Sequence, residues 1–201
     1  MRPQSLRTAM LAAALGGLAA CASDRSISAP SDQLALTAQR ATTSAGEWNY
    51  HAGDAFLAGL GVPTPNIATA SNGDRVELSG TGTLATHPKS VTGAGTFTHK
   101  NTAGDVVGSG TWTATELLSF RSYGPSPVPG FPPDFEAGVA EIKVHLSPAA
   151  GGTGFDGVLR ITCQLPQVFT PGGFHEGVRL AIADVINFNK EAGGGTLFVR
   201  Q

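Results

Sequence analysis

The chain has 201 residues, of which 27 are glycine and only 14% carry a charge. Its 13 basic and 15 acidic side chains are scattered, without a basic patch or stripe, and this argues against nucleic acid as a partner. The length suits one domain plus a tail. The Gly, Thr and Val content of the second half favours short strands joined by tight turns.

The N-terminal segment carries the features of an export signal. Arg2 and Arg7 supply positive charge, and residues 9–20 form an apolar, uncharged run of the length typical of a signal peptide. That run is too short to cross a bilayer core of about 30 Å. It ends in the sequence Leu-Ala-Ala-Cys at Leu18–Cys21, which resembles the lipobox of bacterial lipoproteins.

The resemblance implies that residues 1–20 are removed and that Cys21 is acylated and becomes the N-terminus. The next residue is Ala22 rather than aspartate, and the sorting rule of double-membrane bacteria then favours the outer membrane. We therefore expect an exported protein held at the cell envelope by a lipid anchor, since two or more acyl chains give a long-lived attachment. An ordinary signal peptide with an incidental cysteine, or an uncleaved anchor, is the alternative.

The segment after the anchor, residues 22–46, is rich in Ala, Ser, Thr and Asp and has no sustained apolar period. Such a composition predicts a disordered tether. Trp48 and Tyr50 mark the start of ordered structure. The expected organisation is a signal peptide over 1–20, the lipidated Cys21 and its tether over 21–46, and one domain over 47–201.

From Arg75 onwards, apolar and polar residues alternate with the period of a β-strand. Residues 51–72 lack this period and are expected to be irregular. The alternation is found in seven segments separated by Gly, Pro and Asn: 75–84, 92–100, 105–122, 138–147, 156–165, 177–188 and 196–200. We predict an all-β fold, a single small antiparallel β-barrel of about seven or eight strands, with a β-sandwich as the alternative.

A repeat of glycines and large side chains supports the barrel. The form Gly-x-Gly-Thr-large occurs at Gly80–Leu84, Gly93–Phe97 and Gly108–Trp112. Pairing the last two copies through a loop at 101–104 sets Phe97 against Gly108 and Trp112 against Gly93. Each large side chain then covers a glycine on the neighbouring strand, which permits a strongly curved sheet.

Two residues in the strands could carry chemistry. Parity along 105–122 places Glu116 on the apolar face, where a buried carboxyl can act as a general acid or orient a ligand. Alternatively, a bulge at Leu117 and Leu118 would expose Glu116. In a further alternative, Glu116 lies at the rim of the barrel and pairs with an arginine. Cys163 alternates with apolar residues, so we expect a small core side chain rather than a reactive thiol.

Aromatic residues supply the other candidates for ligand binding. The candidates are Trp112, Phe97, His99, Phe120, Phe131 and Phe135. The last two lie in the Pro-rich stretch 123–135, where they form either an apolar lid or contact patch, or a packed connector that closes one end. No His or Cys spacing typical of a metal site occurs, and no cofactor is expected.

The expected function is that of a surface-tethered binding or structural module of the cell envelope, whose interior could hold a small apolar ligand. Two alternatives remain open. One is a small β-barrel enzyme, isomerase- or cyclase-like, that acts on an apolar substrate with Glu116 as its acid. The other is an envelope protein–protein interaction module that uses the loop 123–135.

The lipid anchor yields a first prediction. Replacing the acceptor thiol in Cys21→Ala should abolish acylation and release the protein from membrane fractions. Incorporation of radiolabelled palmitate and fractionation of cells measure both effects. A wild-type protein that takes up no label, together with a variant that stays equally membrane-bound, would contradict the anchor.

Overall fold

Strand structure begins at Glu47, close to where Trp48 and Tyr50 predict it. The computed structural model describes residues 46–201, so the expected signal peptide, Cys21 and the expected tether up to residue 45 lie outside the described residues. The described part is all-β and every strand pairing in it is antiparallel, as predicted. It contains eleven strands, however, rather than the seven or eight expected.

All seven segments that alternate in sequence contain strands, and 177–188 is divided between two of them. The elements are β1 (Glu47–Ala52), α2 (Ala55–Gly59), β2 (Asn66–Thr69), β3 (Arg75–Thr86), β4 (Lys89–Lys100), β5 (Val106–Pro125), β6 (Phe135–Pro148), β7 (Phe155–Cys163), β8 (Gly177–Ile182), β9 (Ile186–Phe188), β10 (Lys190–Gly193) and β11 (Thr196–Arg200). The stretch 51–72, expected to be irregular, contains α2 and β2. These elements have only five and four residues, too few for a recognisable period.

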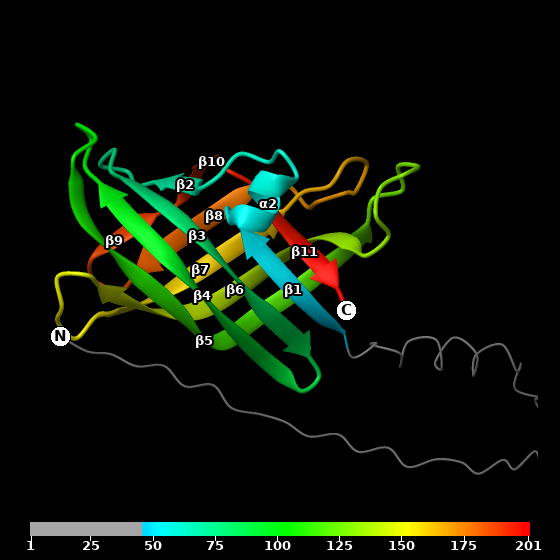
Figure 1. The fold of residues 1–201 in the computed structure, drawn as a ribbon, viewed down its shortest axis with the longest axis horizontal. Helices are drawn as coiled ribbons and strands as arrows, with labels where there is room; N and C mark the ends of the chain where they lie inside the picture. The colour runs from blue at the N-terminus through cyan, green and yellow to red at the C-terminus, as the bar shows by residue number, and fades with distance from the viewer. Residues whose placement is uncertain (1–45) are drawn as a thin grey trace, which may run out of the picture. The chain divides into compact units, whose positions relative to one another are not determined.

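The strand pairings return to their starting point. β1 pairs with β3 and β11, β3 with β4, β4 with β5, β5 with β6, and β6 with β11. β7, β8 and β9 continue from the edge of β6 that also holds β11, while β2 and β10 continue from β3. Figure 1 shows β3, β4 and β5 in front of β7 and β8, with the apolar interior between them.

Glycines allow large rings to fill the middle of this interior. Gly80 on β3 faces Gly95 on β4, and both lie under the fully buried Trp112 of β5. The indole Nε1 donates a hydrogen bond to the carbonyl oxygen of Ser79 at 3.2 Å. A Cβ on Gly95 would lie 1.9 Å from that oxygen and 2.6 Å from Nε1, so a side chain at this position has no room.

The register of the repeat differs from the predicted one. Trp112 faces Gly95, and Phe97 faces Gly110, each two residues away from the expected partner. The large side chains still cover glycines, because a shift of two residues keeps every side chain on the same face of the sheet.

Two single-residue irregularities add up to this shift. Lys100 pairs with Val106, one residue beyond the partner implied by the expected four-residue loop. Val107 is then an extra residue, a β-bulge, because the next pair is His99 with Gly108. Asp105 closes the longer loop, and its backbone N–H donates to Asn101 Oδ1 at 2.9 Å.

The observed register predicts a large effect on stability at one glycine of the repeat and a small effect at another. Gly95→Ala should lower the free energy of unfolding by about 1–3 kcal/mol, because the new methyl group overpacks the strand contact. Gly108→Ala should change it by less than about 0.5 kcal/mol, because a Cβ there meets nothing within 4 Å. Urea denaturation measures both. Equal destabilisation at the two positions would mean that the register is wrong.

Candidate functional site

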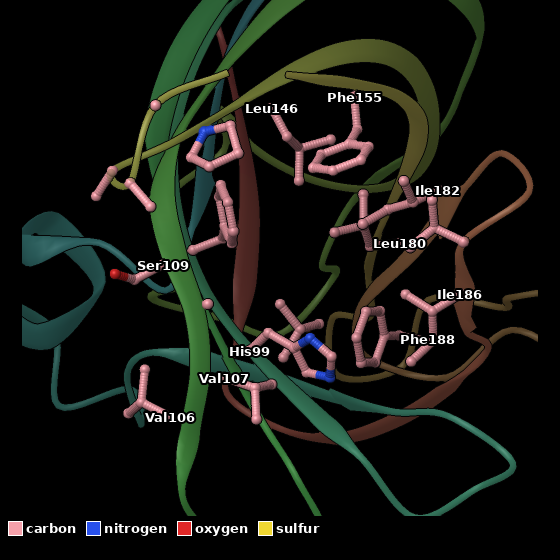
Figure 2. Close-up of a pocket in the computed structure, with 18 residues that line it drawn as sticks. His99, Val106, Val107, Ser109, Leu146, Phe155, Leu180, Ile182, Ile186 and Phe188 are labelled. Atoms are coloured by element: carbon pink, nitrogen blue, oxygen red, sulfur yellow. The ribbon is translucent and has the colours of Figure 1, made fainter. Parts of the chain in front are cut away.

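An apolar cavity of about 550 Å³ opens at one end of the strands (Figure 2). Its walls come from the starts of β3, β5 and β7, the ends of β4, β6 and β8, and β9. These segments meet because the strands are antiparallel, so that starts and ends alternate around one end of the interior.

The cavity has a buried apolar floor and an exposed apolar rim. Five buried side chains contribute to the floor: Val76, Phe97, Leu146, Leu180 and Phe188. Four side chains at the rim are between 45% and 59% exposed: Val106, Val107, Phe155 and Val185. Large apolar side chains gathered at the mouth of an apolar cavity are typical of a binding site, whereas scattered ones carry no such meaning.

His99 is the one titratable side chain that lines this cavity. Its Nε2 lies 3.0 Å from Asp74 Oδ2, and its ring lies edge-on to Phe188 with the centroids 5.3 Å apart. Figure 2 shows His99 beside Phe188 in the cavity, whereas the hydroxyl of Ser109 points away from it. Asp74 thus holds the imidazole in place and leaves Nδ1 as the atom that can bond to a ligand.

The other aromatic candidates lie apart from this cavity. Trp112 is fully buried in the middle of the interior. Phe120 is half-buried and packs on Trp48 and Phe198, with ring centroids 4.7 Å and 4.9 Å away. Of the six candidates from the sequence, Phe97 and His99 therefore lie together in the cavity, and Phe131 and Phe135 line a different hollow.

Glu116 is not buried: strand parity does not place it correctly, and the alternative of a bulge that exposes the side chain is the one observed. Its Oε2 lies 2.5 Å from Lys143 Nζ, and both side chains are more than half exposed. A β-bulge between Ala114 and Glu116 shifts the alternation by one residue, so that Leu117 takes the buried place. The hydrogen bond from Lys143 and its positive charge lower the pKa of Glu116.

A second hollow, the Glu176 groove, has a volume of about 600 Å³ and lies at the opposite end of β6, β7 and β8 from the cavity. Its apolar walls come from α2 with the residues that follow it, from the Pro-rich stretch, and from the start of β11. Phe131 and Phe135 of the Pro-rich stretch lie edge-on to one another, with ring centroids 6.1 Å apart.

Glu176 lines this groove and was not predicted from the sequence. Its Oε1 accepts a hydrogen bond from the backbone N–H of Thr196 at 2.6 Å. The Thr196 hydroxyl lies 2.9 Å from the same oxygen and 2.6 Å from the Thr162 carbonyl oxygen, so its one proton is shared between the two acceptors. Glu176 Oε2 accepts a hydrogen bond from the backbone N–H of Gln164. Burial raises the pKa of the carboxyl to about 7, although these hydrogen bonds act in the opposite direction. No local pattern marks Glu176, because its burial arises where three distant segments meet.

Cys163 is a fully buried core side chain, as predicted. Burial raises the pKa of its thiol well above the ordinary value, and the negative charge of Glu176 adds to this effect. A thiol that stays protonated is a poor nucleophile, so the structure places no reactive cysteine at either hollow.

Within residues 46–201, no cluster of three or more His, Cys, Asp or Glu side chains could hold a metal ion. The same part of the chain has no helix long and apolar enough to cross a membrane. Comparison with known proteins finds no matching family model, no matching curated protein and no matching solved structure.

The two carboxyl groups should titrate on opposite sides of the ordinary glutamate range. Glu176 should show a midpoint near pH 7, while Glu116, next to Lys143, should titrate below its ordinary value. Carboxyl carbon shifts in NMR spectra measure both midpoints, with Glu176→Gln and Glu116→Gln assigning the signals. A raised pKa in the folded state also means that Glu176 lowers stability as pH rises from the ordinary range to about 7. Two midpoints within the ordinary range would contradict the burial of Glu176.

Proposed function

We propose that this domain is a small β-barrel that binds a mainly apolar ligand in its end cavity. The closed ring of pairings supports a barrel over a sandwich, because a sandwich consists of two separate sheets whereas all eleven strands here belong to one. The cavity is lined by four strands of this ring, β3 to β6, and by β7, β8 and β9, which continue from β6.

One observation carries the proposal. The floor and the rim of the cavity are apolar, and a single polar group lies among them. A volume of about 550 Å³ lies within the range of small-molecule sites, which are mostly apolar and contain a few polar groups that orient the ligand. His99, held by Asp74, fits that orienting role. The ligand class is therefore a hydrocarbon body with one group that can hydrogen-bond to an imidazole.

The lipobox supports a second part of the proposal, the place where this binding happens. Acylation of Cys21 would hold the domain at a lipid membrane of the cell envelope, with the outer membrane favoured by Ala22. Apolar molecules concentrate at such surfaces, so a tethered apolar cavity would lie where its ligands are found.

The two alternative functions receive less support. The enzyme interpretation depended on Glu116 as a buried acid, and this side chain is exposed and paired with Lys143. The interaction module depended on Phe131 and Phe135 as a free contact patch, and both are half-buried walls of the Glu176 groove.

Filling the cavity tests the proposal. The neutral fluorophore 1-aminoanthracene should bind to the purified protein, and Gly108→Phe should weaken binding at least tenfold, because Gly108 lines the cavity and has open space above it. The matched control is Gly172→Phe, at an exposed glycine with equally open space that lines neither hollow. Fluorescence titration, with a detergent blank, gives the dissociation constants.

The proposal fails if the wild-type protein does not bind the fluorophore, or if the two phenylalanine variants bind it equally well. Native mass spectrometry of the purified protein provides an independent test. A co-purified small molecule that is present on the wild type and on Gly172→Phe, but absent from Gly108→Phe, is the expected result.

A further inference from the structure

The Glu176 groove differs in chemistry from the end cavity. Its lining is otherwise apolar or uncharged, with Leu57, Leu60 and Val62 on one side and Phe131 and Phe135 on another. Glu176 is the one titratable side chain among the lining residues. A carboxyl in such surroundings is costly as a charge unless something pairs with it.

Two glutamates of the described part have nearly buried side chains, whereas Glu176 is half-buried, and both have such partners. The Glu136 side chain is 4% exposed and lies 3.3 Å from Arg200 Nη1. The Glu191 side chain is 5% exposed and lies 2.6 Å from Arg179 Nε. Within residues 46–201 Glu176 forms no ion pair, and no Lys, Arg or His lines its groove.

The carboxyl of Glu176 also has an open acceptor site. An ionised carboxylate offers about four lone-pair sites, two on each oxygen. On Oε1, the Thr196 N–H donates one hydrogen bond, and the Thr196 hydroxyl divides its one proton between this oxygen and the Thr162 carbonyl oxygen. On Oε2, the Gln164 N–H is the one donor. The remaining site, on Oε2, is therefore available to a donor in the groove.

We propose that the groove binds an organic cation, an ammonium group on an apolar body, with the ammonium against Glu176 and the body against the apolar walls. A cation supplies the charge that Arg200 and Arg179 supply to the other two carboxylates. The rings of Phe131 and Phe135 add surfaces that attract a cation through their electron-rich faces.

Protonation of Glu176 should regulate this binding. Burial raises its pKa to about 7, so the carboxyl is about half ionised at neutral pH. A cation pairs with the ionised form only, and its affinity should rise as pH rises through this range. The other titratable groups nearby are the buried thiol of Cys163, which stays protonated, and the exposed chain neighbour His175.

Three small water-soluble probes with one skeleton test the charge preference. They are 2-phenylethylammonium, 2-phenylethanol and phenylacetate, and ligand-observed NMR with the purified full-length protein gives their dissociation constants. At pH 8 the ammonium should bind at least tenfold more tightly than the alcohol. The anion should bind more weakly than the alcohol. The affinity for the ammonium should fall about tenfold between pH 8 and pH 6, because a pKa of about 7 leaves about a tenth of the carboxyl ionised at pH 6.

Two variants locate the effect. Glu176→Gln should bind the ammonium at pH 8 at least as weakly as the wild type does at pH 6, because glutamine is never ionised, and should lose the pH dependence. Glu116→Gln removes the same charge from an exposed site elsewhere and should behave like the wild type. Because the probes and the pH series use the wild-type protein, the test does not depend on the folding of either variant.

Several outcomes overturn the proposal. Equal affinity for the ammonium and the alcohol at pH 8, or tighter binding of phenylacetate, would show that the groove does not select a cation. A wild-type affinity that is constant between pH 6 and pH 8, or an unchanged affinity in Glu176→Gln, would show that Glu176 is not its partner. None of these results bears on the end cavity, where the 1-aminoanthracene titration is the separate test.

Discussion

The contact of facing glycines beneath large rings is the constraint on which the rest of the structure depends. Gly82 and Gly93 face each other on β3 and β4, and the hydroxyl of Tyr50 lies over them and donates to the Thr92 carbonyl oxygen at 2.9 Å. Trp112 lies in the same way over the next glycine pair along these strands. The two rings fill the middle of the interior, and neither lines the cavity or the Glu176 groove. The cavity therefore lies where these glycine pairs end, and Val76, Phe97 and His99 of the same two strands line it.

The ring of strands closes at a short seam that a buried carboxylate stabilises. β6 and β11 share only two residue pairs, Phe198 with Glu136 and Val199 with Phe135. Glu136 accepts hydrogen bonds from Trp48 Nε1 of β1 at 2.7 Å and from the Ser122 hydroxyl of β5, and Arg200 of β11 supplies its counter-charge. Side chains from four strands thus converge where backbone pairing is sparse. In this setting a carboxylate holds the fold together because the chain supplies both its hydrogen bonds and its counter-charge. The chain supplies hydrogen bonds to Glu176, but among the described residues it supplies no counter-charge.

The sequence predicts the strands well and the sites poorly, for physical reasons that individual residues make clear. Long strands with one buried face show a clear alternation, whereas β2 and β10, with four residues each, are too short to show it. One extra residue in a loop or a bulge, such as Val107, leaves no trace in composition, and the bulge beside Glu116 reversed the predicted orientation of its side chain. Glu176 could not be found in this way, because its environment is made by contacts between segments far apart in the chain.

The two hollows differ in the group that would orient a ligand, and the ligands proposed for them differ accordingly. The cavity offers an imidazole whose ionic partner, Asp74, already belongs to the protein, so a ligand there need not carry a charge. The groove offers a carboxyl without such a partner. Between them, β6 and β7 contribute buried side chains such as Ile142 and Leu159, which face each other in the core. Close-packed cores resist small displacements, so binding at one end has no easy route by which to alter the other. The arrangement therefore favours two independent sites over one coupled device.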